Sequence, residues 1–198
     1  MNIFPMIIEH MYIVLIAVVI SVAIGITLGV VSYWVAYLDK IILWITEVIQ
    51  TIPSLALLAM LMIVFGLGNT TIIVGLILYA LMPIVRNTYI GLTDVSPHII
   101  DAARGMGMNK LQRLIKVELP LSFPIIFTGI KIATVNSLSI AVMGVLIGAG
   151  GLGYPIYRGI QTINIERILS GAIPVVMMAL IFDYIMSKIE HKLIKRAR

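Results

Sequence analysis

The sequence predicts an all-α polytopic membrane protein with five transmembrane helices. The chain has 198 residues, of which 61% are hydrophobic and only 12% are charged, and its mean hydropathy is +1.11. Soluble domains contain about 25% charged residues. Several uncharged stretches also exceed the roughly 20 apolar residues that cross the hydrocarbon layer of a bilayer. The chain contains no cysteine, and no motif in it predicts a cofactor or a metal site.

Two long uncharged stretches occupy the first half of the chain. No charged residue occurs from position 11 to position 38, and none occurs from 48 to 85. The second stretch is far too long for one crossing at about 1.5 Å per residue. Glycines at 66 and 68 supply a turn within it, and Pro53 is expected to break or kink the local helix. We therefore expect three spans in this half, over residues 12–33, 50–66 and 71–90.

A polar segment at 93–120 separates these spans from the last two. It carries seven charged residues in a chain that otherwise has few. The apolar residues after it predict a fourth span over 121–147, followed by a glycine-rich run at 148–159. A fifth span is expected over 168–187, and a basic tail over 188–198 follows it.

Positive charge predicts how the chain is oriented in the membrane. Eleven of the fourteen Lys and Arg residues lie on one side of the predicted spans, two lie on the other, and Lys131 falls within the fourth span. Lysine and arginine concentrate on the cytoplasmic side of membrane proteins. We therefore expect the polar segment and the C-terminus in the cytoplasm and the N-terminus outside the cell membrane. Because this charge flanks the spans, it indicates contact with membrane lipid and not with nucleic acid.

Local signals divide the polar segment into two short helices. Ser96 and Pro97 favour a helix start, and the glycines at 105 and 107 favour its end. Asn109 begins a pattern typical of a capping box. The second helix is expected to reach Glu118 and to stop at Pro120.

The spacing of this segment resembles a known motif. The run from Asp101 to Ala103 is followed by Gly107 and then by Val117-x-Leu119-Pro120. This resembles the EAA loop of ABC-importer permeases, with Asp in place of Glu and Val in place of Ile. The resemblance implies a type I permease domain over 11–187 and a loop that docks on a cytoplasmic ATP-binding subunit. The coupling residues that it implies are Asp101, Ala102, Ala103, Gly107, Leu119 and Pro120.

Four stretches of the chain resemble one branch of that family, the permeases for glycine betaine, carnitine and choline. They lie at 50–61, 81–92, 101–108 and 145–156. The resemblance implies an osmoprotectant importer whose ATP is hydrolysed by a separate subunit, so that the chain itself has no catalytic residue. It also implies an extracellular or periplasmic substrate-binding protein. Because five spans are too few to enclose a path, a second permease copy or a paralogue is expected as well.

Polar side chains within the predicted spans are candidates for the translocation path. In a membrane such groups need partners inside the helix bundle or in a wet cavity. Hydrogen bonding between helices explains the same residues equally well. The path candidates are Gln50, Asn136, Ser137 and Ser139.

Three other functions differ from this interpretation in what they require of the sequence. An ABC permease for an amino acid such as methionine has the same architecture and remains open. An ion-coupled secondary transporter should carry carboxylates near the midplane, whereas the one acidic residue within a span, Asp183, lies near a span end. An intramembrane enzyme is disfavoured because the three histidines fall at interfaces or in loops and no nucleophile has an obvious base.

Overall fold

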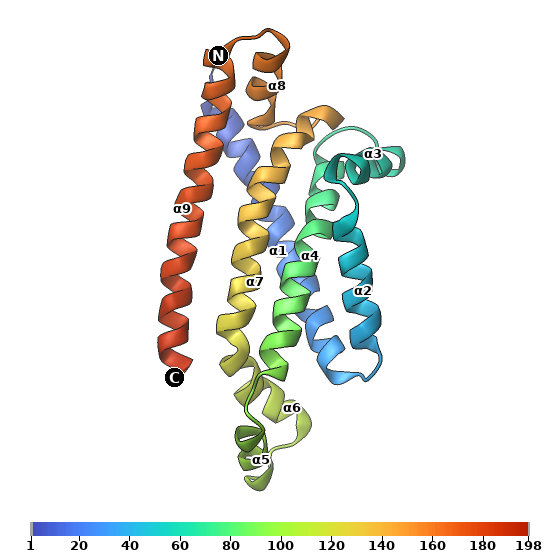
Figure 1. Cartoon of the computed structure of the whole chain (residues 1–198), viewed down its shortest axis with the longest axis vertical. Coiled ribbons are helices and arrows are strands. Elements are labelled where there is room, and N and C mark those ends of the chain that lie inside the picture. Colours follow the sequence, from blue (N-terminus) through green and yellow to red (C-terminus); the bar gives the residue numbers. More distant parts are fainter. Residues whose placement is uncertain (1, 198) are drawn as a thin grey trace.

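The computed structural model describes residues 2–197, and every regular element within that range is helical (Figure 1). Four long helices are apolar enough to cross a membrane: α1 (Phe4–Trp34), α4 (Asn69–Thr93), α7 (Leu119–Ile140) and α9 (Ile165–Ala197). Helix α4 packs between α1 and α7, and α9 packs on the other side of α7. The all-α membrane fold is therefore confirmed.

The second span differs from the predicted helix over 50–66. Two helices occupy this region, α2 (Leu38–Thr51) and α3 (Ser54–Phe65), and they are bent by 100° relative to each other. Pro53 causes the break, because a proline disfavours helical geometry in the residue before it, and Ile52 is extended. Counting the bent pair as one span gives the five that the sequence predicts.

Helix α2 lies largely outside the predicted span because it carries three charged residues, two of which contact polar side chains of α4. Glu47 lies 3.4 Å from an Arg86 nitrogen, and the Tyr89 hydroxyl donates to Asp39 over 3.3 Å. These pairs hold α2 beside α4, as Figure 1 shows. Hydropathy registers the charges of α2 but not their partners on another helix. The predicted span therefore begins at residue 50, whereas α2 begins at Leu38.

The close contact between α1 and α4 depends on two small residues. A Cβ added at Gly25 would lie 2.7 Å from Ile84, and one added at Gly29 would lie 2.4 Å from Thr88. Both distances are shorter than any real van der Waals contact, so only glycine allows this approach. Packing of this kind is a main source of helix association in lipid, where apolar side chains gain little from leaving the solvent.

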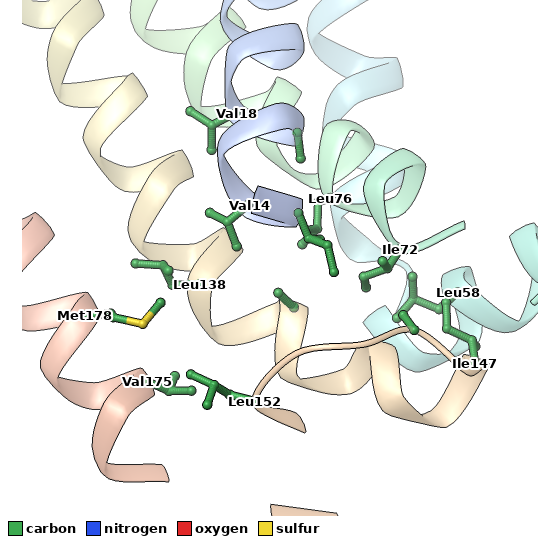
Figure 2. Packing of buried hydrophobic residues seen from close by; sticks show 14 residues of the cluster. Val14, Val18, Leu58, Ile72, Leu76, Leu138, Ile147, Leu152, Val175 and Met178 are labelled. Carbon is green, nitrogen blue, oxygen red and sulfur yellow. The ribbon is translucent and has the colours of Figure 1, made fainter. Parts of the chain in front are cut away.

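The main apolar core lies toward the N-terminal end of α1 (Figure 2). Val14 of α1, Leu76 of α4 and Leu138 of α7 meet there, and Met178 of α9 closes the cluster from the side. Leu58 of α3 also belongs to it. The bent helix α3 is therefore packed against the bundle and not loosely attached to it.

The fourth span has nearly the predicted extent. Helix α7 continues as a 3-10 segment, η2 (Ala141–Ile147), and the glycine-rich run then leads into the short helix α8 (Gly153–Gln161). Helix α9 begins close to the predicted position but does not end at 187. It runs through the basic segment as far as Ala197.

The polar segment projects from the end of the bundle that lies farthest from the N-terminus (Figure 1). It contains α5 (Pro97–Gly105), α6 (Lys110–Arg113) and a π-helical segment, η1 (Leu114–Glu118). The predicted stop at Pro120 is wrong, because η1 passes directly into α7. The wide π turn accommodates a proline, which has no N–H to donate and would clash with the carbonyl of an α-helical turn.

Candidate coupling and translocation sites

The turn after α5 has the geometry of a Schellman motif. The N–H of Met108 donates to the Ala103 carbonyl over 3.2 Å, and the N–H of Gly107 donates to the Arg104 carbonyl over 2.9 Å. Gly107 has φ +79°, a left-handed conformation that glycine adopts at little cost. A Cβ at this position would meet nothing within 4 Å. Backbone conformation, and not space, therefore calls for glycine here.

Helix α6 begins with the predicted capping box. The Gln112 N–H donates to Asn109 Oδ1 over 2.8 Å, and the Asn109 N–H donates to Gln112 Oε1 over 3.0 Å. At the start of α5, Pro97 occupies the first turn as expected, but the Ser96 side chain makes no capping hydrogen bond. Both ends of the turn between α5 and α6 are thus fixed by local hydrogen bonds.

The structure divides the six predicted coupling residues into two groups. Asp101, Ala102 and Gly107 are exposed on α5 and its turn, where Asp101 pairs with Arg104 over 3.1 Å. Ala103 is buried against the rest of the segment. The other two residues, Leu119 and Pro120, form the first turn of α7. The first group presents a small exposed surface, and the second lies where the segment joins the bundle.

The junction with the bundle contains a buried ion pair that the sequence analysis missed. Arg113 Nε lies 2.5 Å from Glu118 Oε1, and the Glu118 side chain is 1% exposed. Both charges are visible in the sequence, but their pairing depends on the π-helical geometry of η1. A charged residue directly before Leu119-Pro120, at the edge of a span, was the available signal.

Three of the four path candidates come together beside the bend in the second span. Gln50 of α2 and Asn136 and Ser137 of α7 line one small cavity, of about 10 Å³, with Tyr79 of α4. The cavity has room for about one water molecule. Ser139 does not line it and lies on an exposed part of α7. The structure therefore joins these candidates with a residue that the sequence analysis did not select.

Residues 21–195 match the family described as binding-protein-dependent transport system inner membrane component. The chain belongs to this family. It is accordingly a permease subunit of an ABC importer and not itself an enzyme. Membership in this family also accounts for the multi-pass membrane fold.

Several relatives of the permease carry substrate names. It is 47% identical over 150 residues to the glycine betaine/carnitine/choline transport system permease protein OpuCD of Bacillus subtilis, an alignment that covers 75% of this chain and 66% of that protein. It is 36% identical over 189 residues to the carnitine transport permease protein OpuCB of Listeria monocytogenes, with 96% and 87% covered. It is 44% identical over 163 residues to the choline transport system permease protein OpuBD of Bacillus subtilis, with 80% and 72% covered. The chain thus spans just under two thirds of the first relative and more of the other two.

The fold of the permease is similar to that of a chain in the MetNI methionine ABC transporter in inward-facing conformations. The TM-score is 0.86, and 96% of this chain and 95% of that chain are covered. Sequence identity is 22% in one crystal form and 23% in the other. This likeness confirms the type I importer architecture and, at such identity, concerns the fold alone.

A polar cluster fixes the glycine-rich run of the permease at the end of the bundle opposite the polar segment. Glu9 of α1 accepts hydrogen bonds from the Gly151 N–H over 3.1 Å and from Asn69 Nδ2 over 3.2 Å. Asn69 in turn accepts from the Gly150 N–H over 3.0 Å. The run is therefore tied to α1 and α4.

Lys131 of the permease forms a polar contact between α7 and α9. Its Nζ lies 2.9 Å from Glu190 Oε2, 3.0 Å from Ser187 Oγ and 3.9 Å from Asp183 Oδ1. Thr128 also donates to Glu190. A lone lysine in one span and a lone aspartate in another could have indicated such a pairing, which the sequence analysis did not propose.

Proposed function

We propose that this chain is the membrane-spanning permease subunit of an ATP-driven importer for quaternary ammonium osmoprotectants such as glycine betaine, carnitine and choline. The observation that carries the proposal is the similarity, at 36–47% identity, to permeases that are named for these three substrates. The alternative of a methionine permease rests on fold similarity at 22–23% identity. Similarity at this level does not indicate which substrate is transported. The relatives in sequence therefore favour the osmoprotectant function.

The proposed mechanism is alternating access driven from the polar segment. A cytoplasmic ATP-binding subunit docks on the exposed surface around Asp101, Ala102 and Gly107, and its closure moves α5 and α6. Leu119 and Pro120 pass this movement to α7, because they form its first turn. A second permease copy or a paralogue completes the path, and the assembly lies in the cell membrane with the polar segment in the cytoplasm.

The proposed path passes the bend between α2 and α3. Gln50, Asn136 and Ser137 supply polar groups beside the bend, and Ser139 continues the polar face one helical turn beyond Asn136. A quaternary ammonium group has no N–H to donate, so aromatic faces would hold it better than ion pairs would. Selection is therefore assigned to an external binding protein, and the permease provides a weakly interacting passage.

Substrate selectivity tests this function. The permease is reconstituted in proteoliposomes with its ATP-binding subunit and its binding protein, and ATP-dependent uptake of labelled glycine betaine is measured. Unlabelled carnitine or choline in excess is expected to reduce this uptake, and methionine in equal excess is expected to leave it unchanged. Uptake of labelled methionine, with none of glycine betaine, would contradict the proposal.

A further inference from the structure

The polar segment at 93–120, to which the proposed function assigns coupling, is called the coupling segment. Its junction with the bundle, residues 113–120, is called the neck. It is the point through which α5 and α6 are connected to α7. A backbone hydrogen bond defines the π winding of the neck: the Leu119 N–H donates to the carbonyl of Leu114, five residues earlier. Single π turns within α-helices occur frequently at functional sites.

The ion pair of the neck depends on this winding. Arg113 and Glu118 are five residues apart, and at about 100° per residue an α-helix would place their side chains about 140° apart. A π turn brings residues i and i+5 to the same face. The contact between Arg113 Nε and Glu118 Oε1 therefore fixes the π register, and the register in turn fixes how α6 is rotated about the axis of α7.

Stability alone does not explain the pair. Replacing a buried ion pair with apolar side chains of similar size is often neutral or stabilising. Within the part of the chain that the structure describes, the second carboxylate oxygen of Glu118 is buried and makes no hydrogen bond of normal geometry, although the Tyr33 side chain of α1 lies beside this carboxylate. An unpartnered buried acceptor lowers stability. The arrangement is thus better suited to fixing an orientation than to maximising the free energy of unfolding.

The surroundings of the neck connect it to two further helices. Ser122 Oγ donates to the Gly91 carbonyl of α4 over 2.7 Å, which joins α4 and α7 directly below the pair. Lys110 Nζ of α6 lies 5.4 Å from the ring centroid of Trp34, the last residue of α1. A pocket of about 180 Å³ lies between the start of the segment, at residues 94–99, and Leu121 and Ile125 of α7. The start of the segment is therefore less closely packed on α7 than the neck is.

We propose that Arg113 and Glu118 are positioning residues that hold the coupling segment at a fixed rotation relative to α7. With the pair intact, a displacement imposed on α5 and α6 moves α7 as a rigid continuation. Without it, the neck relaxes toward the α register and absorbs the displacement. This inference rests on the proposed coupling to an ATP-binding subunit.

The test compares uptake with ATP hydrolysis in the reconstituted importer. Glu118→Gln removes the charge at one side of the pair, and the double variant Arg113→Met/Glu118→Met removes both charges while keeping the side-chain volume. The matched control is Lys116→Met, which removes a positive charge from an exposed position of the same segment. In the double variant, glycine betaine uptake per ATP hydrolysed is expected to fall by about tenfold or more, with the ATP-binding subunit still associated.

A second measurement does not depend on the transported solute. Because the chain has no cysteine, spin labels at Leu111→Cys on α6 and Ile132→Cys on α7 report the distance between these helices in the assembled complex. The double variant is expected to broaden or shift the distance distribution. If wild-type liposomes take up no glycine betaine, the proposed cargo is wrong, and the distances still decide the role of the neck.

Two results would overturn the positioning role. One is an uptake-to-ATP ratio and a distance distribution in the double variant that match those of the wild type. The other is failure of both neck variants to assemble while Lys116→Met assembles normally, which would make the pair a requirement for folding and not for coupling.

Discussion

The hydroxyl of Tyr79 donates a hydrogen bond to the carbonyl of Ile52, at the break between α2 and α3. A helix that breaks within a span leaves backbone groups without helical partners, and lipid offers none. Tyr79 supplies such a partner from α4 and also lines the small cavity with Gln50, Asn136 and Ser137. One side chain thus links the bend in the second span to the candidate path.

Two substitutions in α7 test the path at the scale of single residues. Asn136→Ala and Ser137→Ala each remove one polar group from the cavity wall. A typical hydrogen bond contributes about 1 kcal/mol, so the maximal uptake rate of each variant is expected to change by about two- to tenfold. Steady-state uptake kinetics measure this change, with permease abundance in the membrane as the control. If both variants keep wild-type kinetics, these residues are not part of the path.

Residue types predicted the path candidates only incompletely. Asn136 and Ser137 are identifiable because strongly polar side chains are rare within spans. Tyr79 is not, because its ring is largely apolar and does not stand out in a hydrophobic helix. Its role follows from the break at Pro53, on a different helix. Ser139 shares the polarity of its neighbours but lies outside the cavity, because helical geometry turns it away from Ser137.

At the scale of elements, the glycine-rich run is a fixed part of the bundle. Hydrogen bonds from Gly150 and Gly151 to Asn69 and Glu9 hold the run against α1 and α4. A further hydrogen bond, from the Gly68 N–H to the carbonyl of Ile147, directly before the run, over 2.9 Å, joins the end of η2 to the loop before α4. A run held in this way has a defined shape that a partner could recognise.

Gly150→Ala tests whether this attachment matters. The added Cβ would lie 2.0 Å from Glu9 Oε1, so the end of this flexible side chain must shift and its hydrogen bonds are weakened, at a cost of about 1 kcal/mol. Thermal unfolding of the permease in detergent should show a lower midpoint. The matched control is Gly105→Ala, where a Cβ meets nothing within 4 Å and alanine favours the helix. Equal midpoints for Gly150→Ala and the wild type would contradict the attachment.

The elements that the sequence predicted well are those whose signal is local. Long apolar runs predicted α1, α4, α7 and α9, because about 20 such residues are enough to span a bilayer. The capping box and the left-handed glycine were also predictable from neighbouring residues. The position of α2 and the π winding before Pro120 were not, because each depends on side-chain partners that become neighbours only in the folded chain.

At the scale of the whole molecule, one helix connects the two ends. Helix α1 carries Glu9 of the polar cluster near its start and Trp34, which contacts Lys110 of α6, at its end. It packs closely on α4 through Gly25 and Gly29. The glycine-rich run and the coupling segment are therefore attached to the same pair of helices, which suits a permease that opens at one end while it closes at the other.

The central claim is that the segment around Gly107 couples this permease to ATP hydrolysis, and one substitution tests it directly. Gly107→Arg places a large charged side chain on an exposed turn and forces it into a left-handed backbone. Gly107→Asn is the matched control, because asparagine adopts this conformation more readily than other residues with a side chain. Both variants are measured in the reconstituted importer for membrane insertion, association with the ATP-binding subunit and ATP-driven uptake of glycine betaine. We expect Gly107→Arg to insert normally but to lose association and uptake, while Gly107→Asn retains most of both; wild-type uptake by Gly107→Arg would contradict the account.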